Sequence, residues 1–303
     1  MAVAGVLTAL ALGGCSASGS DASANAPGTT APTSTPSTPS TSPSAPLAPS
    51  TDATPLDPNA LRYVALGDSY AAAPGVPQSD LAGGCFRSDH NYAHLVAEAD
   101  PTIALTDVTC SGATSDDVIA KQVPELTPDT DLVTLGVGGN DFGLFTRVLG
   151  GCLALASSQN AGPAPCTDTA SSEVSKVSAD IQTNIGKVLD AIAQAAPDAR
   201  IIVVGYPALL PADGTTCPDL VPLADGDYPF VASINRGLSN ALRGQAEERD
   251  LSFLDVFAAS KGHDVCSDDP WVNGINVAAD GTIPFHPFGV EQAAVATMIT
   301  DLL

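Results

Sequence analysis

Two residues far apart in the chain, Ser69 and His286, could together carry out nucleophilic chemistry. Ser69 follows Gly67 and Asp68, directly after the apolar run Tyr63–Leu66. The run predicts a buried strand, and Gly67 allows a sharp turn that places the serine hydroxyl at the strand's carboxyl end, where open α/β sheets bind their ligands. A nucleophile at this point needs a base and an anion site. Alternatively, Asp68 and Ser69 only cap the next segment.

The base must come from one of four histidines. His286 is the best candidate, because a proline lies within two residues on each side and restricts the backbone that carries the ring. His263 lies in a polar loop, where it could orient the loop or line the entrance to the site. His90 and His94 are four residues apart and could bind a metal, but nothing nearby completes such a site. Surface or capping roles therefore fit this pair better.

Two further loops could stabilise a negative charge. Asn140 follows the apolar run Leu132–Val137 after two glycines, and its side-chain amide can donate to an oxyanion. Gly112 follows the run Ile103–Val108 and could bring a bare backbone N–H close to a bound group. An ordinary turn with Thr114 as a helix cap explains the second loop equally well.

Apolar, β-favouring runs alternate with segments of helical spacing along the chain. The predicted strands are Tyr63–Leu66, Ile103–Val108, Leu132–Val137, Arg200–Val204 and Leu251–Leu254. The predicted helices are Asn91–Glu98, Thr114–Gln122, Ser171–Ala196, Val231–Arg249 and a last one from about Pro287 to Leu303. The alternation predicts a mostly parallel sheet covered on both faces, with its functional loops at one edge. We expect loops such as Leu144–Asp168 and Leu209–Pro229 to form the pocket walls.

The first 58 residues read as targeting and tethering segments. Residues 1–15 combine an apolar stretch with Leu-Gly-Gly-Cys, which resembles the lipobox of bacterial lipoprotein signals and predicts lipidation of Cys15. A cleaved signal without lipid is the alternative. Residues 16–58 consist almost entirely of Ser, Thr, Pro, Ala and Gly, a composition typical of a disordered tether. The sequence therefore predicts one folded domain over residues 59–303, exported and either anchored at the cell surface or secreted.

The chain is strongly acidic, with a formal net charge of −23. This balance argues against nucleic acid and anionic lipid surfaces as electrostatic partners. Contact with a membrane is expected only through the lipid at Cys15. Apart from Cys15 there are six cysteines, an even number that indicates disulfides in an exported chain. Their spacing lacks the paired C-x-x-C clusters of a zinc site.

In its order of motifs, the chain resembles an SGNH hydrolase of the GDSL esterase/lipase family, and especially the secreted, disulfide-containing bacterial branch. The resemblance covers nearly all of residues 59–303. The matching blocks are Gly67-Asp68-Ser69, Ser111-Gly112, Gly138-Gly139-Asn140-Asp141 and His286-Pro287. The resemblance implies a three-layer α/β/α, flavodoxin-like fold with a mostly parallel five-stranded sheet. It further implies sequential disulfides, which here are Cys85–Cys110, Cys152–Cys166 and Cys217–Cys266.

The resemblance also implies the roles of the site residues. Ser69 is the expected nucleophile and His286 the base, and the oxyanion hole consists of the Ser69 and Gly112 backbone N–H groups with the Asn140 side chain. Many members have Asp three residues before the histidine, where this chain has Ile283. The imidazole is therefore expected to bind the backbone carbonyl of Ile283, with the Asp280 carboxylate as the rival partner.

The expected activity is hydrolysis of small-molecule or lipid acyl esters through an acyl-enzyme, by a monomer without metal or organic cofactor. One alternative is a carbohydrate O-deacetylase that acts on cell-envelope glycan with the same machinery. The other is a non-catalytic surface protein that binds glycan or lipid.

Overall fold

The computed structural model describes residues 60–81, 83–158 and 162–303. The predicted signal segment, the predicted lipidation site Cys15 and the predicted tether 16–58 lie outside the described residues. Among the residues that are described, no helix is both long and apolar enough to cross a bilayer.

A parallel five-stranded sheet forms the middle layer, as predicted. Its order is β4-β1-β5-β6-β7, so the first strand along the chain lies second in the sheet. This is the flavodoxin-like order, in which the topology reverses beside β1 and creates a crevice at the carboxyl ends of the strands. The strands are β1 (Leu61–Gly67), β4 (Ile103–Asp107), β5 (Leu132–Gly136), β6 (Arg200–Val204) and β7 (Ser252–Leu254). A separate small hairpin pairs β2 (Ser79–Asp80) with β3 (Arg87–Ser88).

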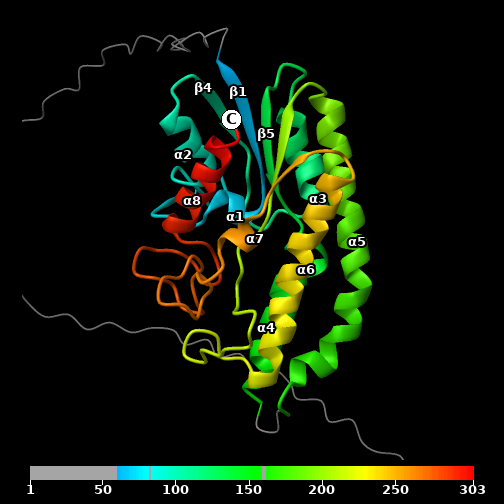
Figure 1. Ribbon diagram of the computed structural model, residues 1–303, viewed down its shortest axis with the longest axis vertical. Helices are drawn as coiled ribbons and strands as arrows, with labels where there is room; N and C mark the ends of the chain where they lie inside the picture. Colours follow the sequence, from blue (N-terminus) through cyan, green and yellow to red (C-terminus); the bar gives the residue numbers. More distant parts are fainter. Residues whose placement is uncertain (1–59, 82, 159–161) are drawn as a thin grey trace, which may run out of the picture. The chain divides into compact units, whose positions relative to one another are not determined.

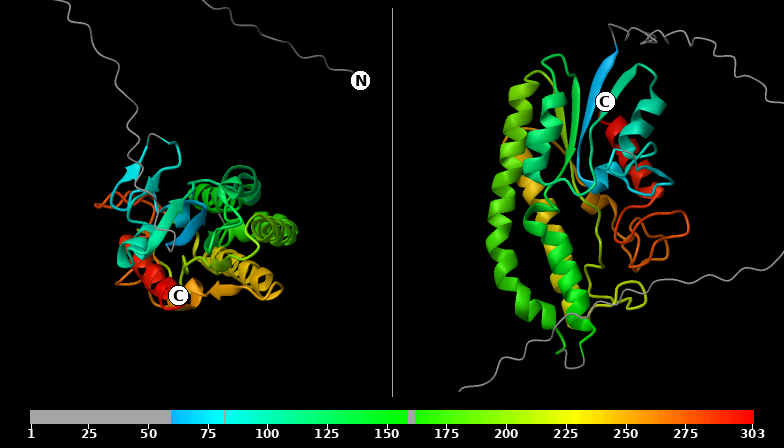
Figure 2. Two further views of the ribbon diagram at one scale, coloured as in Figure 1. Left: turned by 90° about the horizontal axis from the view of Figure 1, so that it is seen from above. Right: turned by 180° about the vertical axis from the view of Figure 1, so that it is seen from behind.

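Helices cover both faces of the sheet and complete the predicted three layers (Figure 1). One face carries α2 (Tyr92–Ala99) and α8 (Gly289–Thr300), with the short α1 (Ser69–Ala72) near the strand ends. The other face carries the long α5 (Pro165–Ala195) and α6 (Tyr228–Glu247), as both views in Figure 2 show. The remaining helical elements are α3 (Ser115–Asp117), η1 (Val118–Gln122), η2 (Val123–Glu125), η3 (Asp141–Gly143), α4 (Leu144–Ala156), η4 (Asp225–Asp227) and α7 (Val256–Ala259).

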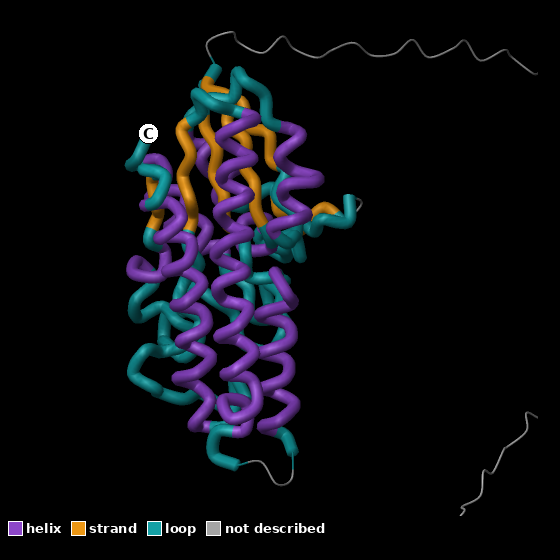
Figure 3. Tube along the Cα trace, turned by 90° about the vertical axis from the view of Figure 1, so that its right-hand side faces the viewer, coloured by secondary structure: helices purple, strands orange, loops and turns teal. Residues whose placement is uncertain are grey.

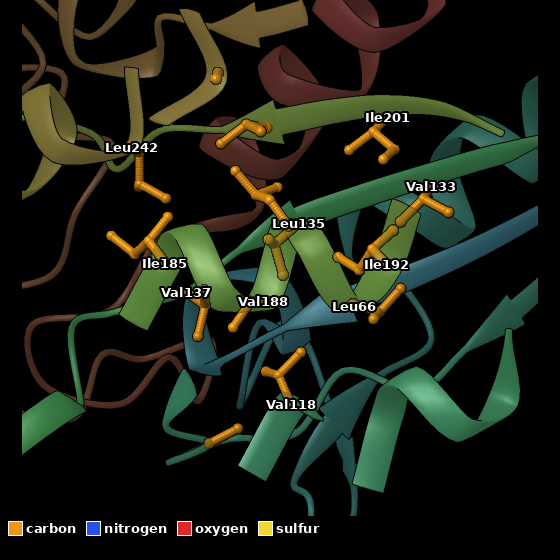
Figure 4. Close-up of a cluster of buried hydrophobic side chains, with 14 of the residues drawn as sticks. Leu66, Val118, Val133, Leu135, Val137, Ile185, Val188, Ile192, Ile201 and Leu242 are labelled. Carbon is orange, nitrogen blue, oxygen red and sulfur yellow. The ribbon is translucent and has the colours of Figure 1, made fainter. Parts of the chain in front are cut away.

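The core between the sheet and the long helices explains why these segments fold together. Strand β5 is buried along its whole length, as expected for a central parallel strand with both faces covered. Figure 4 shows Leu66 and Leu135 of the sheet against Ile185 and Val188 of α5. The apolar residues of α5 recur at helical spacing, and those from Ile181 to Ile192 are buried in the core against the sheet.

Three predicted elements near the site differ from the structure. Residues 144–156 form helix α4 where we expected a loop, and α5 begins at Pro165 rather than Ser171. Figure 3 shows that these helices continue past the ends of the strands. The predicted helix Thr114–Gln122 is a single α-turn followed by a π-helix. Thr114 caps it through a capping box with Asp117.

Three disulfides are formed among the described residues. They join Cys85–Cys110, Cys152–Cys166 and Cys217–Cys266, which are the pairs that the resemblance implies. The second of them connects the last turns of α4 to the start of α5. This disulfide therefore holds α4 beside the crevice.

Candidate active site

A cavity of about 520 Å³ opens at the carboxyl ends of the strands. The segments that follow β1, β4, β5 and β6 all contribute to its lining, together with the loop before α8 and one face of α4. The predicted site residues Ser69, Gly112, Asn140 and His286 all line this one cavity. Residues separated by more than two hundred positions in the sequence are thus brought to one place by the sheet topology.

The turn that presents Ser69 depends on Gly67. This residue has φ +151°, and a Cβ on it would lie 2.7 Å from the Gly136 carbonyl oxygen, so a side chain does not fit. The Gln122 side chain clamps Gly67 from the π-helix, accepting from its N–H at 2.8 Å and donating to its carbonyl at 2.9 Å. Asp68 then caps α1 by accepting from the Tyr70 N–H. Ser69 is thereby held rigidly at the start of a helix.

The backbone N–H groups of Ser69 and Gly112 are available to a ligand. Within the described part of the chain, neither donates to another group. Gly112 has φ +82°, a left-handed conformation that glycine adopts without strain, and open space lies where a side chain would be. An incoming carbonyl oxygen could therefore approach this backbone closely.

Asn140 is oriented by its neighbours. Its amide nitrogen donates to the Ala113 carbonyl at 3.1 Å, which leaves its second N–H hydrogen for another acceptor. The next residue, Asp141, accepts from the Ser115 N–H at 2.7 Å and from the Asn184 amide at 3.3 Å. The loop that carries Asn140 is thus fixed to both α3 and α5.

The partner of His286 differs from both of the predicted ones. The imidazole Nδ1 lies 2.8 Å from the Pro284 carbonyl oxygen, one residue beyond Ile283. The Ile283 carbonyl instead accepts from the Asn273 amide at 3.2 Å, and the Asp280 carboxylate accepts from the Thr282 N–H at 3.0 Å. Because a carbonyl only accepts, the proton resides on Nδ1, and the lone pair of Nε2 is free to act as a base.

The loop around His286 is also tied to the nucleophile segment. Phe285 adopts φ +59°, an unfavourable conformation for a bulky residue, and its carbonyl accepts from the Tyr70 hydroxyl at 2.7 Å. The Tyr70 ring lies 5.5 Å from the His286 ring, measured between centroids. Since Tyr70 adjoins Ser69, one residue fixes the histidine loop relative to the serine.

Burial lowers the pKa of His286 below its ordinary value of about 6.5, and the Pro284 carbonyl opposes this only in part. The imidazole should therefore be neutral, and able to accept a proton, from mildly acidic pH upward. We expect kcat/KM for an ester to rise with pH through a midpoint below about 6.5. Burial also raises the pKa of Asp68 to about 7. The control is the same pH profile measured on Asp68→Asn. If His286 is the titrating group, the rise of kcat/KM with pH persists in this variant. Loss of that rise would contradict the assignment to His286.

Tyr206 is a site residue that the sequence did not reveal. Its hydroxyl donates to the Asp68 carboxylate and accepts from the Gly139 N–H at 3.2 Å. Asp68 precedes Ser69, and Gly139 precedes Asn140, so one hydroxyl connects the two loops. The ring packs edge-on against Tyr70 at 5.0 Å. The only signal for Tyr206 in the sequence is its position just after β6. Site residues also follow the carboxyl ends of β1, β4 and β5.

We expect Tyr206→Phe to lower kcat by about ten- to a hundredfold with little change in KM, because both loops lose their common anchor. The measurement is steady-state hydrolysis of one ester by the variant and the native chain. Tyr228→Phe is the matched control. The Tyr228 hydroxyl is also buried and also joins two groups, here the backbone carbonyl of Val221 and the backbone N–H of Cys217, but it lies outside the cavity lining. Equal losses in both variants would mean that Tyr206 acts only on stability.

The other histidines lie outside this cavity lining. His263 binds the Asp269 carbonyl at 2.8 Å and stacks on Trp271 at 4.7 Å, so it orients its own loop. His90 contacts Asp89, and His94 contacts Asp107 at 3.5 Å. Over residues 60–81, 83–158 and 162–303, no three His, Cys, Asp or Glu side chains gather in a way that could hold a metal ion.

The chain is similar to known lipases over most of its length. The GDSL-like lipase/acylhydrolase family matches over residues 65–287. Lipase 2 of Streptomyces coelicolor is 34% identical over 255 residues, which cover 80% of this chain and 86% of that protein.

Solved structures show the same fold. Phospholipase A1 from Streptomyces albidoflavus superposes with a TM-score of 0.68 at 28% identity, over 80% of this chain and 99% of that one. An extracellular lipase from Streptomyces rimosus gives a TM-score of 0.69 at 27% identity, over 80% of this chain and 100% of that one.

Proposed function

Because this chain belongs to the GDSL-like lipase/acylhydrolase family and is a carboxylic ester hydrolase, we propose that it cleaves acyl esters through a covalent intermediate on Ser69. The observation that carries this proposal is the shared cavity. It brings together the Ser69 hydroxyl and the His286 imidazole, whose Nδ1 is bound to the Pro284 carbonyl. The backbone N–H groups of Ser69 and Gly112, which have no partner within the described residues, lie at the same cavity.

The first half of the reaction forms the acyl-enzyme. His286 Nε2 takes the proton of the Ser69 hydroxyl while Oγ attacks the carbonyl carbon of the ester. The carbonyl oxygen becomes an oxyanion, which accepts hydrogen bonds from the N–H groups of Ser69 and Gly112 and from the Asn140 amide. The intermediate then collapses, the bond to the leaving oxygen breaks, and the alcohol departs with the proton from His286.

The second half releases the acid. A water molecule gives a proton to His286 Nε2 and attacks the acyl carbon, so that the same donors hold a second oxyanion. The Ser69–acyl bond breaks, and the proton returns from His286 to the Ser69 oxygen. A carbonyl partner fixes the imidazole tautomer as a carboxylate would, but it stabilises the imidazolium less. The Pro284 carbonyl therefore serves mainly to orient the ring.

The lining of the cavity favours an acyl chain over a sugar as the group recognised. Phe86, Phe145, Leu149, Leu153 and Phe285 contribute to it, and apolar side chains of this kind bind hydrocarbon. The test is hydrolysis of p-nitrophenyl esters and of an acetylated polysaccharide by the full chain. Release of p-nitrophenol supports the proposal. Acetate release from the polysaccharide alone would identify a carbohydrate O-deacetylase, and no release from either would indicate a binding protein.

We further propose that the chain is exported and is anchored through a lipid at Cys15. The disulfides support export, since such bonds persist in oxidising compartments, and the similar Streptomyces rimosus lipase is extracellular. The Leu-Gly-Gly-Cys motif supports the anchor. Fatty-acid labelling of the native chain but not of Cys15→Ser is the expected result, and equal labelling of both would exclude Cys15 as the anchor.

A further inference from the structure

Helix α4 separates two hollows in the surface, and its residues divide between them at helical spacing. One face lines the active-site cavity through Phe145, Thr146, Leu149, Gly150 and Leu153. The opposite face lines an outer groove against α5 through Leu144, Arg147, Val148, Gly151 and Leu155. Gly150 and Gly151 are therefore neighbours in the sequence, but Gly150 faces the active-site cavity and Gly151 faces the outer groove.

Neither glycine is required by the backbone. Both lie inside the helix, and neither has a positive φ. A Cβ on Gly150 or Gly151 would meet nothing within 4 Å, whereas one on Gly186 of α5 would collide with Gln245. Glycine is the least favourable residue in a helix interior apart from proline. What Gly150 provides is thus open space in the wall of the active-site cavity.

We propose that the acyl chain of the substrate lies along this face of α4, and that Gly150 determines how long a chain the cavity accepts. The inference rests on the proposed function and adds the feature that selects among esters. From Phe145 to Leu153 the apolar face extends for about 12 Å along the helix axis. Gly150 lies between two of its leucines, so a chain that follows this face must pass it.

Helix α4 is held in place, so the space beside Gly150 has a fixed size. Leu149 and Cys152 are buried, and Cys152 is bonded to Cys166 at the start of α5. A side chain added at position 150 therefore cannot be accommodated by an outward shift of α4. Gly150 is exposed and lines the cavity, so the added side chain would project from the cavity wall at its open side.

The experiment compares Gly150→Leu with Gly151→Leu on p-nitrophenyl esters of acetyl, butanoyl, decanoyl and dodecanoyl chains. The leaving group is constant, so any change in preference reports on the acyl side. In Gly150→Leu, we expect kcat/KM for the long chains to fall relative to acetyl by about ten- to two-hundredfold, the range over which apolar pockets discriminate. In Gly151→Leu, the same added side chain points into the outer groove, and the ratio should stay at the native value.

Gly150→Ala and Gly151→Ala provide variants that fold without difficulty, because alanine favours helix more than glycine does. Gly150→Ala should move the long-to-short ratio in the same direction as the leucine variant but less. An unchanged ratio in both Gly150 variants, or an equal loss for every chain length, would overturn the inference while the esterase activity of the native chain still stood. If the native chain cleaves none of these esters, the proposed function itself fails.

Discussion

Replacing Ser69 with alanine is expected to abolish ester hydrolysis, with a loss of at least about 10⁴-fold in kcat. Without the hydroxyl there is no atom for His286 to activate and no acyl-enzyme. The fold should be preserved, because α1 is capped by the Asp68 side chain and not by that of Ser69. The measurement is kcat for a p-nitrophenyl ester, with the melting temperature determined alongside.

Ser233→Ala is the control for this experiment. It removes an exposed serine hydroxyl on α6, whose partner is the Phe230 carbonyl. Native activity is expected in this variant. Hydrolysis by Ser69→Ala at a rate comparable to the native chain would remove the basis of the proposed mechanism.

Replacing Asn140 with alanine should lower kcat by about 10²- to 10³-fold, equivalent to about 2.7–4 kcal/mol of transition-state stabilisation. The amide is expected to bind the oxyanion more strongly than the neutral carbonyl of the substrate, so KM should change little. Steady-state kinetics on the same ester separate the two constants.

Asn140→Asp sharpens this test because it keeps the shape of the side chain. A carboxylate cannot donate to an oxyanion and repels it, so this variant should lose at least as much activity as Asn140→Ala. If Asn140→Asp kept native kcat, or if Asn140→Ala raised only KM, the amide would not be an oxyanion donor.

The sequence was sufficient to predict the sheet and the four residues that meet in the cavity. Buried parallel strands are short apolar runs, and the site residues follow such runs or adjoin prolines and glycines that shape the backbone. Helix α4 was missed because two central glycines argue against a helix. It forms nevertheless because its buried side chains pack in one cluster with distant residues such as Leu209 and Val231. Local helix propensity does not include such long-range contacts.

The partner of His286 was misplaced by one residue for a similar reason. The path of the loop is set by the Asn273 side chain, which binds the carbonyls of Asn276, Thr282 and Ile283 and so removes Ile283 from the reach of the imidazole. Tyr206 was missed because a single tyrosine after a strand forms no motif. Its importance lies in two hydrogen bonds to loops more than sixty residues away in the chain.

The most direct test of the central claim is to treat the native chain with a fluorophosphonate and to map the modified peptide by mass spectrometry. These reagents trap a serine that has been activated by a neighbouring base and held beside an oxyanion site. The adduct is predicted on Ser69, and labelling should be lost in His286→Ala. An adduct on another residue, or undiminished labelling of Ser69 without His286, would contradict the account.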